Sequence, residues 1–287
     1  MFLKPWAHFA LAALAAAAAS EALGQVARMN YGQYLVETLR SRHRDILLIG
    51  LHVTPPGESD NIIIASNFGR LGKKADDDDL FVISSGVAKA EANKAGTRYA
   101  VELPMRNVDG ATIGALGLNF ALRPGQDKAA LERRAELIRD ELARRSADAG
   151  NLLDPFPFEA STTTLTHAQK LLDAWLAKHP QVLIASLRVP RAGGAALAAS
   201  NIGRHGQAAD ANDVKVLFTQ RSSLIADAAG RVHFKFVLRD GKGAPAALLD
   251  LVLPSGDAAA AQDRATALSE DFETLMVSAP ELLQLDP

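Results

Sequence analysis

The pattern of hydrophobic and polar positions predicts two similar sets of helices and strands, one in each half of the chain. In the first half, apolar residues recur at helical spacing over 31–42 and 127–145. Strands are predicted between these helices, over 46–53, 61–66, 80–83, 98–105 and 112–122. The order helix, strands, helix predicts an antiparallel sheet with helices on one side, which is an α+β fold.

The second half repeats the same order of elements. Helices are predicted over 166–178 and 258–276. Strands are predicted between them, over 182–189, 195–200, 215–219, 232–238 and 246–253. We therefore expect two tandem domains, each an antiparallel sheet flanked by an N-terminal and a C-terminal helix.

The residues themselves also repeat. The stretch SNFGRLG at 66–72 returns as SNIGRHG at 200–206, and acidic residues follow both stretches. This repeat predicts domains at 25–150 and 162–287, joined by a linker at 151–161. The linker contains Phe156 and Phe158, which we expect to pack against the domains and fix their relative orientation.

Residues 1–24 have the pattern of an export signal. Lys4 precedes an Ala-rich apolar core, and Ala22 and Gly24 offer a small-x-small cleavage site. The core is too short to span a bilayer stably. We expect cleavage near Gly24 and a periplasmic or secreted protein; an uncleaved anchor is the alternative.

The amino-acid composition excludes some classes of function. The chain has no cysteine, which excludes disulfides, thiolate metal sites and cysteine nucleophiles. Its formal net charge of -2 argues against a nucleic-acid partner, because no basic surface is available to neutralise phosphates. Without disulfides, each domain must be held together by its hydrophobic core.

A glycine-containing hairpin provides a resemblance to a known family. Residues 108–118 read VDGATIGALGL. This segment resembles the D-G-x-x-I-G-x-L-G segment of PAS-like Cache domains, extracytoplasmic small-molecule sensor modules whose paired form is the double Cache. The second copy, DGKGAPAALL at 240–249, keeps the turn but lacks the strand glycines. The resemblance implies a free-standing PAS-like pair that needs a separate partner for signalling.

The repeated loop supplies the first candidate ligand-binding residues: Asn67, Arg70, Asn201 and Arg204. Its glycines allow positive φ and expose backbone N–H groups. An amide and a planar guanidinium beside them could hold a carboxylate or a phosphate. The alternative is structural, with Asn and Arg bracing the loop against the aspartates that follow it.

The resemblance adds a second set of candidates on the strands. Tyr99, Glu102, His233 and Lys235 are expected to line a PAS-type cavity, with His233 aligned to Tyr99. The acidic run 76–79 fits either a helix start or a Ca²⁺ site. The helix start is favoured, because the run lacks the spacing of an EF-hand loop. No metal site is predicted.

No sequence motif of an enzyme appears: there is no nucleophile elbow, P-loop, His-Glu-x-x-His or dinucleotide fingerprint. We therefore expect a non-catalytic, exported small-molecule-binding protein without a cofactor, acting as a sensor or an uptake accessory. Its ligand would be an organic acid, an amino acid or a metal chelate, and a membrane receptor or transporter would be its partner. The alternatives are an interaction scaffold without a ligand and a hydrolase or haem-handling protein.

Overall fold

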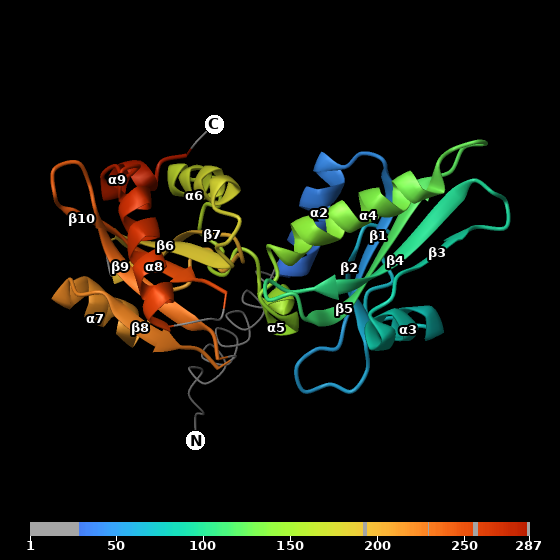
Figure 1. Ribbon diagram of the computed structural model, residues 1–287, viewed down its shortest axis with the longest axis horizontal. Coiled ribbons are helices and arrows are strands. Elements are labelled where there is room, and N and C mark those ends of the chain that lie inside the picture. The colour runs from blue at the N-terminus through green and yellow to red at the C-terminus, as the bar shows by residue number, and fades with distance from the viewer. Residues whose placement is uncertain (1–28, 192–193, 229, 255–257, 286–287) are drawn as a thin grey trace, which may run out of the picture.

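The computed structural model describes residues 29–191, 194–228, 230–254 and 258–285. The predicted signal at 1–24 lies outside these residues. Two sheets with their helices stand side by side, joined through α5 and the linker that follows it (Figure 1). Within the described part of the chain, no helix has the length and apolar character needed to cross a membrane.

The described residues of each domain form nine elements. The first domain comprises α2 (Tyr31–Arg42), β1 (Ile46–Val53), β2 (Ile62–Ser66), α3 (Asp77–Ser85), β3 (Lys89–Ala92), β4 (Arg98–Arg106), β5 (Thr112–Ala121), α4 (Lys128–Ala143) and α5 (Ala149–Leu153). The second comprises α6 (His167–Lys178), β6 (Ile184–Arg191), β7 (Gly194–Ser200), α7 (Ala211–Thr219), β8 (Ser223–Ala226), β9 (Val232–Arg239), β10 (Pro245–Val252), α8 (Ala258–Glu273) and α9 (Ala279–Leu282).

The predicted fold class is confirmed. The first sheet has the order β2-β1-β5-β4-β3 and the second the corresponding order β7-β6-β10-β9-β8. All the pairings are antiparallel. The molecule is therefore an α+β protein with two antiparallel sheets, each flanked by an N-terminal and a C-terminal helix, which is consistent with two PAS-like domains.

Alternation along the strands assigns the two faces of each sheet. In β1, Ile49, Leu51 and Val53 are fully buried in the core cluster that includes residues of α2 and α4. The residues between them belong to the other face, because successive side chains of a strand point to opposite sides. In Figure 1, α2 and α4 lie on one side of the first sheet and α3 on the other.

Two predicted strands are wrong. Residues 80–83 and 215–219 lie in the helices α3 and α7. The reason is local: Asp76 and Asp210 are N-caps, and each forms a capping box with the aspartate three residues later. The helix-start interpretation of the acidic run is thereby confirmed. The aspartate side chains accept hydrogen bonds from backbone N–H groups at the helix start, which stabilises a helix although the apolar residues that follow favour a strand.

Phe156 fixes the linker to the first domain, as predicted. Its ring is 6 % exposed and stacks on Tyr34 with ring centroids 3.9 Å apart. The same ring contacts His205 of the second domain edge to face, with centroids 5.6 Å apart. Tyr31 of α2 also reaches across, because its hydroxyl donates to the carbonyl of Asn201 over 3.1 Å. The two domains are thus joined by packed aromatic rings as well as by the chain.

Candidate functional site

The two glycine loops fold in the same way and use their asparagines in the same way. Arg70 and Arg204 both have a left-handed backbone, with φ of 63° and 65°. The side-chain oxygen of Asn67 accepts from the Ile49 backbone N–H over 2.9 Å, and Asn201 does the same with Ala185 over 3.0 Å. These amides have a structural role, but they hold the loops to the sheets rather than to the aspartates that follow the loops.

The two loop arginines have different surroundings. Arg204 forms an ion pair with Asp154 of the linker, with Nε and Oδ2 2.8 Å apart, so its partner is not an aspartate that follows the loop. Beside it, a Cβ on Gly203 would lie 2.7 Å from the Tyr31 ring, which leaves room only for glycine. Arg70 is exposed, and no ion pair involves it among the described residues. Only the first loop therefore leaves its guanidinium free for a ligand.

Arg70 stands at the rim of a cavity of about 410 Å³ on the sheet face opposite α2 and α4. Residues of β1, β2, β4, β5, the glycine loop and α3 line it: Leu48, Gly50, His52, Ile63, Phe68, Arg70, Lys73, Asp76, Asp79, Arg98, Glu102, Gly117 and Asn119. A Cβ on Gly117 would meet nothing within 4 Å, so this part of the floor is open space. The volume suits a small metabolite.

Glu102 is the unusual group of this cavity. Its Oε2 is buried and has no hydrogen-bond partner among the described residues. Burial, together with the charges of Asp79, Asp76 and Asp78, raises the pKa of Glu102 to about 7. A buried carboxylate without a partner is costly, so the site is prepared for a group that brings a positive charge or a hydrogen-bond donor.

His52 and Asp79 form a second polar pair in the cavity. His52 Nδ1 lies 3.1 Å from Asp79 Oδ2, and both side chains are buried. Burial opposes the charged form of Asp79, but the hydrogen bond and charge of His52 outweigh it, so the pKa of Asp79 lies below its usual value. Asp79 is thus a fixed negative charge near Glu102.

The second domain has a matching cavity of about 360 Å³, but its charges are already paired. Through the sheet register, Arg188, Lys235 and Asp250 occupy the places of His52, Glu102 and Gly117. Asp213 is fully buried and lies 2.6 Å from Arg188 Nε and 2.5 Å from Lys235 Nζ. This cavity is held together by its own ion pairs.

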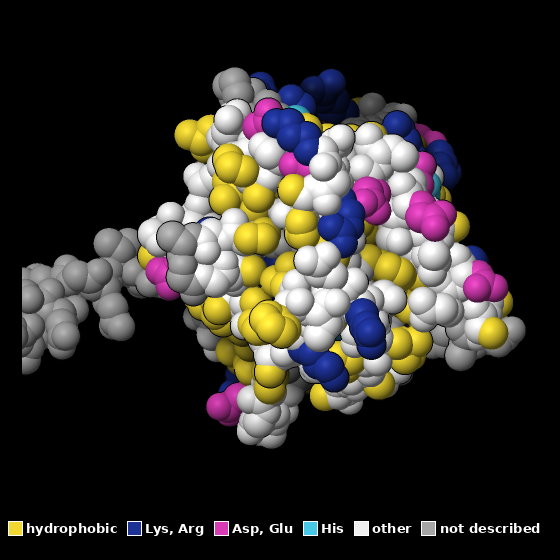
Figure 2. Space-filling view, turned by 90° about the vertical axis from the view of Figure 1, so that its left-hand side faces the viewer, with side chains coloured by type: hydrophobic (Ala, Val, Ile, Leu, Met, Phe, Trp, Pro, Cys, Tyr) yellow, Lys and Arg dark blue, Asp and Glu magenta, His cyan; other side chains and the backbone are white. Residues whose placement is uncertain are grey.

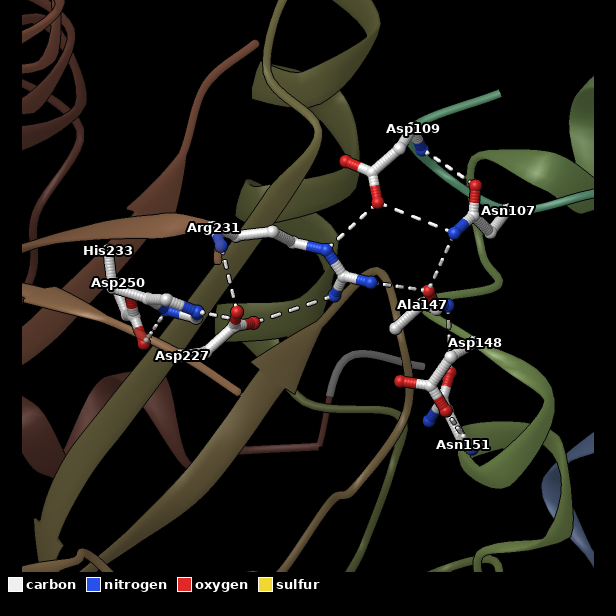
Figure 3. A network of polar contacts seen from close by, with 9 residues as sticks. All are labelled: Asn107, Asp109, Ala147, Asp148, Asn151, Asp227, Arg231, His233 and Asp250. Carbon is white, nitrogen blue, oxygen red and sulfur yellow. Dashed lines mark hydrogen bonds and ion pairs between the residues drawn. The ribbon is translucent and has the colours of Figure 1, made fainter. Parts of the chain in front are cut away.

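His233 connects that cavity to the first domain (Figure 3). Its Nδ1 lies 2.9 Å from Asp250, and its Nε2 lies 3.3 Å from Asp227. Arg231 lies 3.7 Å from the same Asp227, and its Nε is 2.9 Å from Asp109 in the β4–β5 turn. A continuous polar chain therefore runs from the second cavity to the first domain.

Tyr99 does not lie with the other predicted strand residues. In the sheet register it pairs with Phe120 on the core face, and its hydroxyl donates to Glu132 of α4 over 2.5 Å. The first-domain equivalent of His233 is Ala100, so the alignment of His233 with Tyr99 is wrong by one position. A shift of one residue moves a side chain to the other face of a sheet.

The charge of His233 predicts a pH effect on stability. Burial disfavours the imidazolium, but the hydrogen bonds and charges of Asp250 and then Asp227 outweigh it, so the pKa of His233 lies above its usual value. This stabilisation is fully present below the unfolded pKa of about 6.5 and is lost as the pH rises through the folded pKa. His233→Gln should remove this pH-dependent part, on the order of 1 kcal/mol. Urea denaturation of both proteins at about pH 5.5 and about pH 8.5 measures this difference in the free energy of unfolding. If His233→Gln lost the same amount of stability at both pH values, the prediction would be contradicted.

Comparisons with known proteins do not assign the chain to a family. No family model matches the chain, and no curated protein matches it. Among solved structures, the chain is similar to a GAF domain from A. aeolicus (15% identity, 38% of this chain and 78% of that chain, TM-score 0.30). It is also similar to PelD from Pseudomonas aeruginosa PAO1 (17%, 87% and 77%, 0.28) and to the periplasmic domain of RsbU from Chlamydia trachomatis (8%, 85% and 83%, 0.26). TM-scores this low support no argument about function.

Proposed function

We propose that the cavity of the first domain binds a small molecule that carries both a protonated amine and an anionic group, without catalysing a reaction on it. The observation that carries the proposal is the buried, unpartnered oxygen of Glu102. An ammonium group placed between Glu102 and Asp79 would satisfy that oxygen and neutralise the neighbouring negative charge.

The rim of the cavity complements the other end of such a ligand. Arg70, Lys73 and Arg98 line the opening, and all three are exposed. Their positive charges favour a carboxylate or a phosphate, and a guanidinium can bind either one through two hydrogen bonds. A molecule with an amine at one end and an acid at the other is therefore the best match.

The absence of catalysis is part of the proposal. Among the described residues that line the cavity there is no serine, threonine or tyrosine to act as a nucleophile beside His52 and Asp79. Export to the periplasm, a duplicated PAS-like pair of the Cache type and a membrane receptor or transporter as partner belong to the same proposal. The matching sheets and repeated loops support the duplication.

A matched series of four-carbon probes tests the ligand class. We expect 4-aminobutyrate to raise the melting temperature most, n-butylamine to raise it less and n-butyrate to leave it unchanged, because only the amine reaches Glu102. Stabilisation grows with the ratio of ligand concentration to Kd, so the probes are compared at the same concentrations. Stabilisation by butyrate but not by butylamine would overturn the assignment of the amine site.

The rim assignment makes a separate prediction. Arg70→Ala should weaken binding of 4-aminobutyrate about tenfold or more while its effect on butylamine stays small, since the lost contact is with the acid. Arg204→Ala is the matched control, because Arg204 occupies the same loop position but is paired with Asp154. Calorimetric titration measures both variants. Unchanged binding in both would remove the loop arginines from the site.

One observation favours the alternative, an interaction scaffold. Such a protein should expose an apolar surface, and Figure 2 shows hydrophobic side chains spread over the outer face of the second domain. Large exposed hydrophobic residues of this domain include Val214, Phe218, Leu224, Leu283 and Leu285. Ligand binding in the first domain and protein contacts by the second are compatible functions.

A further inference from the structure

A cavity larger than the two described above is separate from the proposed ligand site. It is a groove of about 680 Å³ between α2 and the first glycine loop. Residues from α2, the start of β1 and the loop line it: Gln33, Glu37, Arg40, Ser41, Arg44, Ile46, Ser66, Asn67 and Gly69. We call it the α2 groove.

The second domain shows what such a groove holds. The equivalent space lies between α6 and the second glycine loop, and the C-terminal end of α4 from the first domain enters it. The remaining cavity, about 230 Å³, is lined by Glu141, Arg144 and Arg145 on one side. Asp173, Leu176 and Asn201 line the other side. A helix end from the preceding domain therefore occupies the groove of the second domain.

Hydrogen bonds from the groove fix that helix end. The Asn201 side-chain amide donates to the Leu183 carbonyl over 2.9 Å and to the Arg144 carbonyl over 2.8 Å. The Arg144 guanidinium donates in turn to the carbonyls of Leu176 and Pro180, each over 3.4 Å. The Asn201 side chain thus binds both a strand of its own domain and the end of α4.

In the α2 groove the same asparagine has only half of these contacts. The Asn67 amide donates to the Leu47 carbonyl over 2.9 Å, and it forms no second hydrogen bond as a donor among the described residues. The positions of Leu176 and Pro180 are taken by Arg40 and Arg44, so two arginines and the single carboxylate of Glu37 leave this groove with a net positive charge. It therefore suits a helix C-terminus with negative side chains, because the helix dipole is negative at that end.

Among the described helices, α8 has an end of this kind. In α8, Leu275 N–H donates to the Phe272 carbonyl over 3.0 Å, as Arg145 does to Leu142 in α4 over 2.9 Å. Thr274 therefore takes the place of Arg144. The acidic residues Glu270, Asp271 and Glu273 precede it, and the last turn has no basic residue. The end of α8 matches the α4 end in geometry and the α2 groove in charge.

We propose that the α2 groove binds the C-terminal end of α8 from a second copy of this chain. The contact repeats between molecules the arrangement that joins the two domains within one molecule. It is head to tail, so it joins copies into a ring or an open chain rather than a face-to-face dimer. Within the chain a short linker supplies an effective concentration in the millimolar range, so free copies associate only at high concentration.

Sedimentation and light scattering of the full mature chain test this contact. We expect the weight-average mass to rise by about half or more between about 10 μM and about 1 mM protein. Arg40→Glu and Thr274→Lys should each return the mass to that of the protomer, because each places like charges across the contact. The double variant should regain association, since the charges are then exchanged.

Lys215→Glu is the control for Arg40→Glu, because it reverses a positive charge in the same way at an exposed position of α7. It should leave the concentration dependence unchanged. Circular dichroism confirms that Arg40→Glu and Thr274→Lys remain folded, which is expected for two exposed positions. A mass that stays constant up to about 1 mM would overturn the proposal, as would association that neither charge reversal weakens.

Discussion

Replacing Glu102 with glutamine is expected to abolish ligand binding and, in the same protein, to raise stability at alkaline pH. The amide cannot neutralise an ammonium group, so the affinity for 4-aminobutyrate should fall by more than about thirtyfold, the usual cost of removing one partner of a buried charge pair. The ligand-free protein gains stability because the amide removes the charge of a carboxyl group whose buried Oε2 has no hydrogen-bond partner among the described residues.

The sign of the stability effect follows from the raised pKa of Glu102. In the folded state this pKa is about 7, against 4.5 for the ordinary group. Between these values the folded form binds more protons than the unfolded form, so the free energy of unfolding falls as the pH rises. Part of the side chain is exposed, and solvent screening reduces the loss to on the order of 1 kcal/mol. Glutamine does not titrate, so the variant should keep this stability above pH 7.

Urea denaturation at about pH 5 and about pH 8 measures the effect, and calorimetric titration with 4-aminobutyrate measures the binding. Glu91→Gln is the control, because Glu91 is an exposed glutamate on the neighbouring edge strand β3. It should change neither quantity. If Glu102→Gln lost binding and also lost stability at pH 8, the carboxylate would have a structural role and the proposed ligand contact would be wrong.

The sequence predicted the helices and strands that have long apolar patterns and clear end residues. The helix over 31–42 and the strand over 46–53 have the predicted bounds, because spaced apolar residues and strong end signals define both. The edge strands β3 and β8 were not predicted. Each has four residues, and neither contains a buried one, so no apolar pattern identifies them. The short apolar runs of α3 and α7 are typical of strands, but the aspartate capping boxes that precede them start helices.

The candidate site was predicted in part. Glu102 and Arg70 were identified, and both line the cavity of the first domain. His52 was missed as a member of this site, since its pairing with Asp79 depends on where α3 crosses the sheet. The difference between Arg70 and Arg204 also could not be predicted, because the two loops have nearly the same sequence. Only the placement of the second loop against Tyr31 and Asp154 separates them.

Asp213→Asn is expected to cost about 3–5 kcal/mol of stability, the largest effect of any single substitution considered. Asp213 is fully buried and is the shared partner of Arg188 and Lys235, which are 8 % and 6 % exposed. The amide is close in shape and can still accept from a backbone N–H, so the substitution removes the charge and little else. Two buried cations then lose the carboxylate that they share, and the nearest remaining ones, Asp210 and Asp250, lie 3.8 Å from Lys235 Nζ.

The first domain supplies the matched control. Asp79→Asn changes the same capping-box position, but the side chain paired with Asp79 is a single histidine, so its cost should be about 1 kcal/mol. Urea unfolding of both variants at neutral pH measures the difference. Arg188→Met and Lys235→Met added to Asp213→Asn should restore most of the lost stability, because a buried ion network can be replaced by apolar side chains at little cost. Equal losses in Asp79→Asn and Asp213→Asn would show that the capping box, and not the ion network, makes the aspartate necessary.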